Sequence, residues 1–398
     1  MERNQTYIVP GFAASGIAAG IKADGRPDLA LIRSDVPAVA AGVFTTNRFP
    51  AAPVQIDRDR VARGTARAIL ANSGNANAAT GPDGLADALA TSRELARRLA
   101  IPEEEVLVAS TGVIGHRLPL DRILDGIPRL VAGLKPGGIP AAEEAILTTD
   151  RFPKLAVARA RCGGREITVC GLAKGAGMIE PHMATMLAFI LTDAVVPRDD
   201  LGRLFRRAVR TTFNAISVDG CESTNDTALI LANGVAANRP IAAGGAEGRR
   251  FGAMLTEVMG QLARAMVEDG EGATKRVELC VSGARNRAEA RRIAYAVARS
   301  NLVKTAFYGG DPNWGRIIAA AGSVGIPLTA DRVVLHFEEV LLFSGGQGRA
   351  PDPGRISAIM QQPVIHIRLD LGMGRADFVV QTSDLTRDYV ALNAHYHT

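Results

Sequence analysis

Apolar residues along the chain follow two spacings in turn, one typical of helices and one typical of strands. From Leu85 to Leu99 they recur every three or four residues, which predicts a helix. The run Val106–Ala109 is strand-like and stops at Ser110-Thr111-Gly112, and Ile167–Cys170 is a second strand-like run. Met186–Leu191 is apolar without alternation, which favours a central strand that is covered on both faces.

Helices and strands continue to alternate in the second half. Apolar positions from Met254 to Met266 predict a helix that ends near Gly270, and Ala290–Val303 predicts a further long helix. The stretch Leu134–Ala142 holds two Pro and two Gly and is predicted to be an exposed loop. A final helix is expected to start near Ser383. It follows strands predicted at Val333–Phe337, Val364–Leu369 and Phe378–Gln381.

This alternation predicts an α/β fold in the α+β sense, a layered sandwich of helices over mixed sheets rather than a bundle or a barrel. A length of 398 residues suggests two domains or one large unit. Hydrophobic residues make up 47% and charged residues 22%, which is ordinary for a chain with a sizeable core.

Charge and cysteine content argue against several classes of protein. The net charge of +5 is mild for this length, and no block of Lys and Arg with interleaved aromatics indicates nucleic-acid binding. The four cysteines have no C-x-x-C spacing, so free thiols in a reducing compartment are expected. No apolar run approaches the ~18 residues of a membrane span, and no signal peptide is evident. We therefore expect a cytoplasmic protein without membrane or nucleic-acid partners.

The stretch "KGAGMIEPHMATMLAFIL", residues 174 to 191, combines features of three kinds of site. A phosphate loop is disfavoured because Lys174 precedes the glycines, whereas a Walker loop has its Lys after them. The third small residue of a dinucleotide fingerprint is replaced by Glu180. A metal site is disfavoured because Glu180 and His182 lie only two apart and no H-E-x-x-H motif occurs. No metal is expected.

The third interpretation concerns Thr185. A Thr hydroxyl needs an adjacent base to act as a nucleophile. If the bond between Ala184 and Thr185 is cut, the new α-amine, with an ordinary pKa of ~7.7–8.0, can serve as that base. The preceding glycines allow a strained, tightly turned approach to the cut. However, Thr also starts strands through β-propensity alone, so both interpretations stay open on this stretch.

Several long strings resemble the ornithine acetyltransferase family, also called glutamate N-acetyltransferase, nearly end to end. They include "ILANSGNANAATG" at 69 to 81, "VLVASTGVIG" at 106 to 115 and "AKGAGMIEPHMATMLAFILTDA" at 173 to 194. The order continues with "DGCESTNDTALILANG" at 219 to 234, "EDGEGATK" at 268 to 275, "SNLVKTAFYGGDPNWGRI" at 300 to 317 and the terminal "NAHYHT". Members of this family are self-cleaving enzymes of arginine biosynthesis that use an N-terminal Thr as the nucleophile.

The resemblance implies a role for individual residues. Thr185 matches the nucleophile, with cleavage between Ala184 and Thr185. Thr111 and Gly112 match the pair that stabilises the oxyanion, where losing one donor typically costs ~10²–10³ in rate. Substrate-binding positions match Thr148, Lys174, Thr185, Glu271, Asn393 and Thr398. The register at Thr148 is open to its neighbour Thr149, and Asn72, Asn75 and Asn77 are expected to support the site only through hydrogen bonds.

The implied reaction transfers an acetyl group from N2-acetylornithine to glutamate through an acetyl-Thr185 enzyme. No metal or organic cofactor is implied, and the use of acetyl-CoA as a second donor is left open. The resemblance implies an alpha chain 1–184 and a beta chain 185–398, assembled as a heterotetramer of two of each. It also implies two lobes, near 1–280 and 281–398, with the C-terminal tail returning to the site. The alternatives are a self-processing Thr amidase or aminopeptidase, an N-acyltransferase of a secondary pathway, and a non-enzymatic amino-acid-binding or assembly protein.

Overall fold

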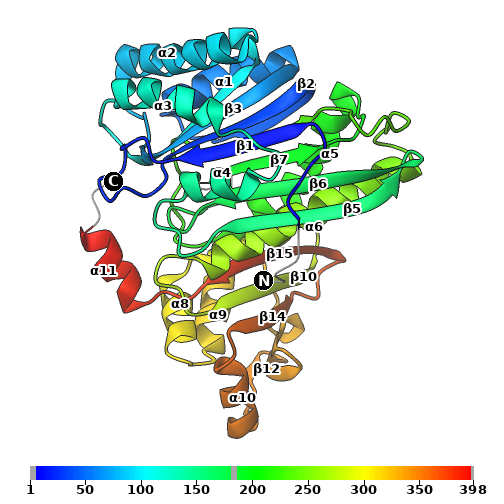
Figure 1. Cartoon of the computed structure of the whole chain (residues 1–398). Coiled ribbons are helices and arrows are strands. Elements are labelled where there is room, and N and C mark those ends of the chain that lie inside the picture. The colour runs from blue at the N-terminus through cyan, green and yellow to red at the C-terminus, as the bar shows by residue number, and fades with distance from the viewer. Residues whose placement is uncertain (1–5, 181–185, 396–398) are drawn as a thin grey trace. The chain divides into compact units, whose positions relative to one another are not determined.

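A computed structural model describes residues 6–180 and 186–395, which fold into two units (Figure 1). The first unit contains the chain up to Asn214 together with Cys221–Met266, and the second contains Ala215–Gly220 and the chain from Val267 onward. Each unit has its own mixed sheet with helices against it, which confirms the predicted α/β class. The units change over at Val267, whereas the expected lobes change over at residue 281, inside strand β10 (Arg276–Ala284).

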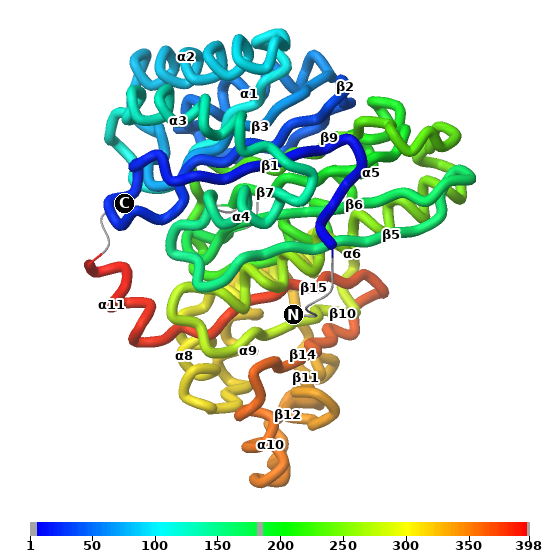
Figure 2. Tube along the Cα trace, viewed as in Figure 1, coloured from blue at the N-terminus to red at the C-terminus, as the bar shows by residue number. Residues whose placement is uncertain are grey.

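The first unit is built on an eight-stranded sheet in the order β4-β3-β2-β9-β7-β6-β5, with β1 paired to β2. Its parallel pairs are β3 with β4 and β7 with β9, and the other pairs are antiparallel. Figure 2 shows the early strands β2 and β3 in blue and the later strands β5 to β7 in green. The strands are β1 (Phe12–Ile17), β2 (Leu29–Phe44), β3 (Thr65–Asn75), β4 (Val106–Val113), β5 (Lys154–Cys162), β6 (Arg165–Lys174), β7 (Leu187–Thr192) and β9 (Thr227–Ala232).

Helices bury both faces of this sheet. Because side chains alternate along a strand, Leu29 and Leu31 of β2 pack in one cluster with α2 and α3, while Ala30 and Ile32 pack in another with α4. Every residue of β7 is buried between β6 and β9, which confirms the predicted central strand. The helices are α1 (Ala52–Arg63), α2 (Gly81–Leu99), α3 (Leu120–Ala132), α4 (Ile139–Ile146), α5 (Arg198–Thr211) and α6 (Ala246–Glu268).

The second unit has a seven-stranded sheet in the order β13-β12-β11-β14-β10-β15-β8. Its strands are β8 (Ile216–Ser217), β10 (Arg276–Ala284), β11 (Val334–Phe337), β12 (Val340–Ser344), β13 (Gln347–Gly348), β14 (Val364–Asp370) and β15 (Ala376–Ser383). Its helices are α7 (Arg287–Ala298), α8 (Asn301–Tyr308), α9 (Trp314–Gly322), α10 (Pro353–Met360) and α11 (Arg387–His395). One apolar cluster, which includes Ile293, Phe307 and Phe337, forms its core.

Three predicted element boundaries are wrong. The long helix expected over Ala290–Val303 is two helices, because the extended Ser300 ends α7 and its side chain caps α8 by accepting the Val303 amide. The loop expected over Leu134–Ala142 becomes α4 at Ile139, where a Pro in the first turn is compatible with a helix. The last helix begins at Arg387 because Ser383 still belongs to β15.

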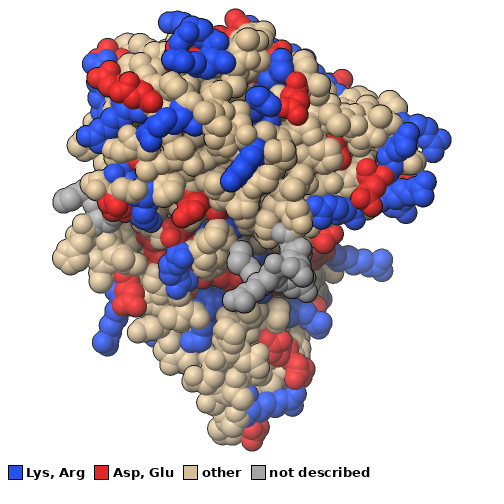
Figure 3. All heavy atoms as spheres, in the orientation of Figure 1, with Lys and Arg blue, Asp and Glu red and all other residues tan. Residues whose placement is uncertain are grey.

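The surface carries both signs of charge. On the face drawn in Figure 3, Lys and Arg side chains are mingled with Asp and Glu. Within the described residues, no helix is long and apolar enough to cross a membrane.

Candidate active site

The end of β4 presents the proposed oxyanion pair. Thr111 is buried, and its side chain makes no hydrogen bond to another residue of the described chain. Gly112 has a φ of 134°, and a Cβ there would lie 2.4 Å from the carbonyl carbon of Gly74 on β3. A side chain at 112 would therefore collide with the neighbouring strand, so this close approach requires glycine.

Three asparagines of "NSGNAN" hold the ends of β3 and β4 in place. Asn72 Oδ1 accepts a hydrogen bond from Ser110 Oγ at 2.6 Å, directly before Thr111. Asn75 Nδ2 donates to the carbonyls of His116 and Arg117 at 3.2 and 3.0 Å, and Asn77 Nδ2 donates to Gly84 at 2.9 Å. These side chains therefore hold the two strand ends and the loops beside them through hydrogen bonds to a hydroxyl and to backbone carbonyls.

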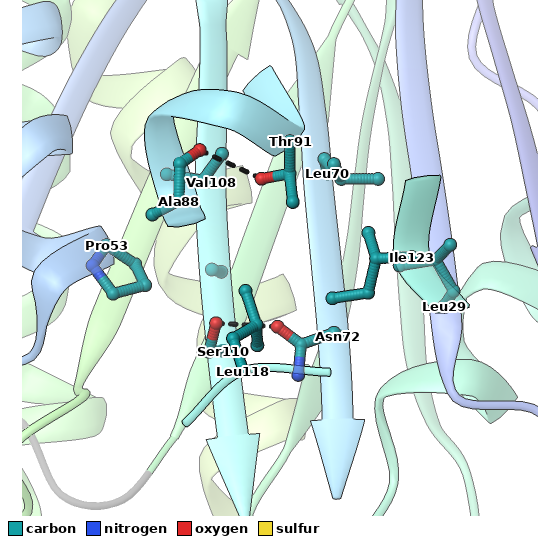
Figure 4. A pocket seen from close by; sticks show the side chains of 11 residues that line it. Leu29, Pro53, Leu70, Asn72, Ala88, Thr91, Val108, Ser110, Leu118 and Ile123 are labelled. Carbon is teal, nitrogen blue, oxygen red and sulfur yellow. Dashed lines mark hydrogen bonds between the residues drawn. The ribbon is translucent and has the colours of Figure 1, made fainter. Parts of the chain in front are cut away.

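A small cavity lies behind this strand end, between β3, β4 and α2 (Figure 4). Ser110 and Asn72 line one side of it, and apolar side chains such as Leu29 and Ile123 line the rest. Its volume of about 10 Å³ is near the size of one water molecule. The cavity is a packing gap, too small for an amino-acid substrate.

Thr148 and Lys174, two predicted binding residues, lie in direct contact. Lys174 Nζ donates to Thr148 Oγ1 at 2.7 Å, so the geometry favours Thr148 over Thr149 as the partner of the lysine. Asp150 joins the pair, with Oδ2 accepting the Thr148 amide at 3.0 Å and Oδ1 accepting the Gly175 amide at 2.7 Å. Lys154 Nζ also donates to Asp150 Oδ1 at 2.7 Å.

In this cluster, the Asp150 carboxyl lies beside two buried lysines, Lys154 and Lys174. The side chains of Asp150 and Lys154 are fully buried, and 3% of the Lys174 side chain is exposed. Burial opposes ionisation of Asp150, but Lys174 and Lys154 outweigh it and hold the pKa of this carboxyl well below its usual range. Because Lys174 Nζ lies 3.6 Å from Asp150 Oδ2, beyond hydrogen-bond distance, the lysine suits a substrate carboxylate.

A cleft of about 450 Å³ adjoins the cluster, and Asp150, Leu147 and Lys22 are among the residues that line it. Lys22 Nζ donates to the carbonyls of Pro27 and Leu147 at 2.8 and 2.6 Å. Burial, with the nearby Arg26, lowers the pKa of Lys22 to about 8. This cleft is large enough for an amino acid, which the cavity of Figure 4 is not.

The beginning of β7 is tied to the oxyanion strand by two adjacent residues. Asn225 Nδ2 donates to the Ser110 carbonyl at 2.8 Å, and Asp226 Oδ1 accepts the Met186 amide at 3.1 Å. Leu187 pairs across the sheet with Lys174 on one side and Thr227 on the other. Met186 is thus held by Asp226, and Leu187, the next residue, lies between Lys174 and Thr227.

The approach to the proposed cut is largely buried and contains one strained residue, Met178. Gly175 has a φ of 155°, and Met178 has a φ of 57°, a left-handed conformation that costs energy for a residue with a Cβ. Ala176, Ile179 and Glu180 are buried. Ala184 and Thr185 themselves lie outside the described residues.

Two further predicted residues, Glu271 and Asn393, meet within the second unit. Asn393 Nδ2 of α11 donates to Glu271 Oε2 at 2.8 Å. On the same loop, the carbonyl of Gly272 accepts a hydrogen bond from Thr386 Oγ1 at 2.8 Å. A Cβ at Gly272 would lie 2.5 Å from the Tyr389 amide nitrogen. The C-terminal helix is therefore anchored on the loop that carries Glu271, while Thr398 lies outside the described residues.

Other chemistries find little support in the described chain. No group of three or more His, Cys, Asp or Glu residues that could hold a metal ion occurs in residues 6–180 and 186–395. The four cysteines are free, and burial raises the pKa of both Cys162 and Cys170 to about 12, so neither is a ready thiolate.

Comparison with known proteins shows which family the chain belongs to. The model of the ArgJ family matches residues 13–398. The arginine biosynthesis bifunctional protein ArgJ of Geobacter sulfurreducens is 52% identical, over 98% of this chain and 100% of its own length. A crystal structure of the corresponding Bacillus halodurans protein is 33% identical with a TM-score of 0.51, over 52% of this chain and 98% of that one. The Mycobacterium tuberculosis ornithine acetyltransferase, solved with ornithine, is 39% identical with a TM-score of 0.41, over 47% and 98% of the two chains.

The fold, the family match and the Geobacter sulfurreducens relative define an acyltransferase of arginine biosynthesis. The chain belongs to the ArgJ family, and its activity is that of an ornithine acetyltransferase and glutamate N-acetyltransferase. The family resemblance and the enzyme class predicted from the sequence are thereby confirmed.

Sequence reasoning missed Asp150, Lys154, Asn225 and Asp226. Asp150 directly follows the two threonines of "ILTTD", and Asn225-Asp226 belongs to the string "DGCESTNDT". The signal was present as polar residues next to apolar strands, but nothing in the spacing tells which carboxyls become buried.

Proposed function

We propose that the chain transfers an acetyl group from N2-acetylornithine to glutamate by way of an ester on Thr185. The α-amine of Thr185 takes the proton of its own hydroxyl, and Oγ attacks the acetyl carbonyl carbon. The Thr111 hydroxyl and the Gly112 N–H donate to the developing oxyanion. The carbon–nitrogen bond to ornithine breaks, and the departing amine takes the proton.

In the second half of the cycle, the glutamate amine attacks the acetyl ester. The ester bond breaks, the proton returns to Thr185 Oγ, and N-acetylglutamate leaves. Every proton moves between substrate and Thr185, so the cycle needs no metal or organic cofactor.

The observation that carries this proposal is a structural link between the oxyanion donors at the end of β4 and the start of β7. Asn225 binds the carbonyl directly before Thr111, and Asp226 binds the amide directly after Thr185. Since the two are neighbours in sequence, the oxyanion donors and the start of β7 are fixed to one another through a single dipeptide. This link supports the proposal that Thr111 and Gly112 serve as oxyanion donors for a nucleophile directly before Met186.

Substrate binding is assigned to the residues that resemble the family's binding positions. Lys174, with Thr148, suits the carboxylate that both substrates carry, because the lysine has only partial compensation from Asp150 at 3.6 Å. Glu271 suits a substrate amine, and its contact with Asn393 orients the carboxylate. Thr185 and Thr398 complete the proposed set.

We infer that the chain cleaves itself between Ala184 and Thr185. The left-handed conformation of Met178, close before the proposed cut, supports this. The chain crystallised from Bacillus halodurans also supports it. That chain aligns over 98% of its length with only 52% of this one, so it is about half as long. A cut at this site would likewise give two chains of similar size, 1–184 and 185–398.

The remaining proposals concern the assembly of the chains, their location in the cell and a second acetyl donor. The cleaved chains form a heterotetramer of two alpha and two beta chains in the cytoplasm, and acetyl-CoA serves as a second donor only if its acetyl group reaches Thr185. These rest on the family resemblance, with free thiols that suit a reducing compartment.

Intact-protein mass spectrometry after incubation with N-acetylornithine tests the proposal. We expect two chains, 1–184 and 185–398, with one acetyl group on the second chain at residue 185. Glutamate should remove that acetyl as N-acetylglutamate, whereas removal by water alone would indicate an amidase. Thr185→Ala should give one unmodified chain. An uncleaved wild-type chain with full transferase activity would overturn the mechanism.

A further inference from the structure

Asp226 is a fully buried carboxyl group, and the reaction above uses only one of its two oxygens. Oδ1 accepts the Met186 amide at 3.1 Å, while Oδ2 has no hydrogen-bond partner in the described chain. A buried oxygen without a partner typically costs ~1–3 kcal/mol of stability, so the presence of Asp226 at this position needs a physical explanation.

The position of Asp226 follows from covalent geometry. Met186 N is bonded to the carbonyl carbon of Thr185, and a residue's own nitrogen lies only two bonds further along the chain. A carboxyl that holds Met186 N is therefore within a few ångströms of any amine at residue 185. Oδ2 is the carboxyl oxygen that is still free to accept it.

The surroundings of Asp226 favour a cation as its partner. Burial raises the pKa of Asp226 well above its usual range, and the carboxylate of Glu222, on the preceding loop, acts in the same direction. The amides of Met186 and Ser223 and the ammonium of Lys174, on β6, oppose this without outweighing it. A buried carboxylate is stable beside a cation it can bond, and a newly formed ammonium would meet that need.

We propose that Asp226 Oδ2 binds the α-amine that cleavage creates at Thr185 and holds it as the base of the transfer reaction. This inference rests on the proposed Thr185 mechanism. Asp226 is a positioning residue, since it acts on the amine and not on the substrate.

The role has a chemical consequence. When the amine takes the proton from Thr185 Oγ it becomes an ammonium, and a carboxylate beside it stabilises that state. Without the carboxylate, the amine is a weaker base and holds its proton only at lower pH. The acid limb of the activity profile should then move to lower pH while the rate falls.

The test compares Asp226→Asn with Asp57→Asn as a matched control. Asp57 is also fully buried, accepts one backbone amide, from Val108 at 2.9 Å, and leaves Oδ2 without a partner in the described chain. Burial raises the pKa of Asp57 as well. It lies on α1, and its amide partner is in the middle of β4 rather than at the head of β7.

Each variant is allowed to cleave, and kcat and KM are measured across pH. The position of a pH limb does not depend on how much of the sample has cleaved. For Asp226→Asn we expect the acid limb of kcat to move down by about one pH unit, kcat to fall about 10-fold or more, and KM to change little. Asp57→Asn should keep the wild-type limb.

Three results would overturn the inference. They are an unmoved limb in Asp226→Asn, an equal shift in Asp57→Asn, and a folded Asp226→Asn that never cleaves, which would assign Asp226 to the cleavage step instead. Failure of the underlying mechanism is distinguishable, because the wild-type protein would then lack the acetyl on Thr185.

If Asp226→Asn does not fold, the proposed contact is tested on the wild-type protein instead. The α-amine of Thr185, labelled with ¹⁵N-threonine, is titrated by NMR. With Asp226 beside it, the amine should titrate at or above the ordinary ~7.7–8.0. A value below about 7 would contradict the proposed contact.

Discussion

At the scale of single residues, the site depends on charges that are buried together. Asp150 receives two backbone amides and one lysine, and a second lysine lies 3.6 Å away. Removing one member of such a group leaves an uncompensated charge, which is far more costly than removing a surface charge. The carboxyl is thus what allows Lys174 to be both buried and cationic.

Substitution of Thr148 and of Thr149 separates the two possible registers at "ILTTD". Thr148→Val removes the hydroxyl that accepts Lys174 Nζ at 2.7 Å. A hydrogen bond to a charged group is worth ~1.5–3 kcal/mol, so KM for N-acetylornithine should rise about 10-fold or more, with a smaller change in kcat. Thr149→Val is the control and should stay within about 2-fold. The reverse order in steady-state kinetics would place the binding role on Thr149.

Residue identities were readable from the sequence only where a string was distinctive. Thr148 and Lys174 were predicted as binding residues, and the structure brings them into contact. Asp150 and Asp226 were not predicted, because their importance lies in burial and in an unfilled hydrogen bond. Both properties depend on strands that are distant in sequence, and composition and spacing do not report them.

At the scale of elements, boundaries set by side-chain caps were the least predictable. Ala290–Val303 has continuous helical spacing, but the Ser300 side chain caps a new helix instead of letting the first one continue. The central strand, by contrast, was predictable because β7 is buried on both faces and needs apolar residues throughout. Patterns of burial are thus visible in a sequence, while local competition between caps and helices is decided by packing.

Helix α4 carries a second buried carboxyl, and its titration predicts a pH dependence of stability. Glu143 Oε1 accepts the Lys154 amide at 2.7 Å, and burial raises the pKa of Glu143 to about 8 from 4.5. Between these values the folded chain holds a proton that the unfolded chain releases, so stability falls as pH rises. Below about 4.5 the contribution is complete, and near 8 it is largely lost.

Glu143→Gln should remove this dependence, because the amide keeps an acceptor oxygen and does not titrate. Wild-type stability relative to the variant should fall by on the order of a few kcal/mol between pH 5 and pH 8. The measurement is urea unfolding on the Thr185→Ala background, so that one covalent chain unfolds. Parallel stability curves for the two proteins across this range would show that Glu143 is ionised in the folded state.

At the scale of the whole molecule, the proposed cut divides the chain differently from its folding units. In the sheet of the first unit, β4, β3 and β2 precede the cut, β9 and β7 follow it, and β6 and β5 precede it again. Strands from the proposed beta chain therefore lie in the middle of a sheet whose two flanks belong to the alpha chain. All seven strands of the second sheet, β8 and β10 to β15, follow the cut.

The two fragments should accordingly stay together after cleavage. The pairs β2 with β9 and β6 with β7 cross between the fragments along six residue positions each. On size-exclusion chromatography in native buffer we expect the fragments to co-elute, and to separate only in denaturant. Elution of free fragment 1–184 from an active, cleaved sample would contradict the interleaved arrangement.

Because the sheet is interleaved, the cleaved enzyme is expected to refold differently from the uncut chain. The uncut chain forms β6, β7 and β9 within one molecule, where chain connectivity keeps the partners at high effective concentration. Once cut and unfolded, the same strands must find one another by diffusion, so recovery becomes dependent on protein concentration. The precursor is in this sense its own assembly factor: the peptide bond that closes off the nucleophile is needed to build the sheet and is then dispensable.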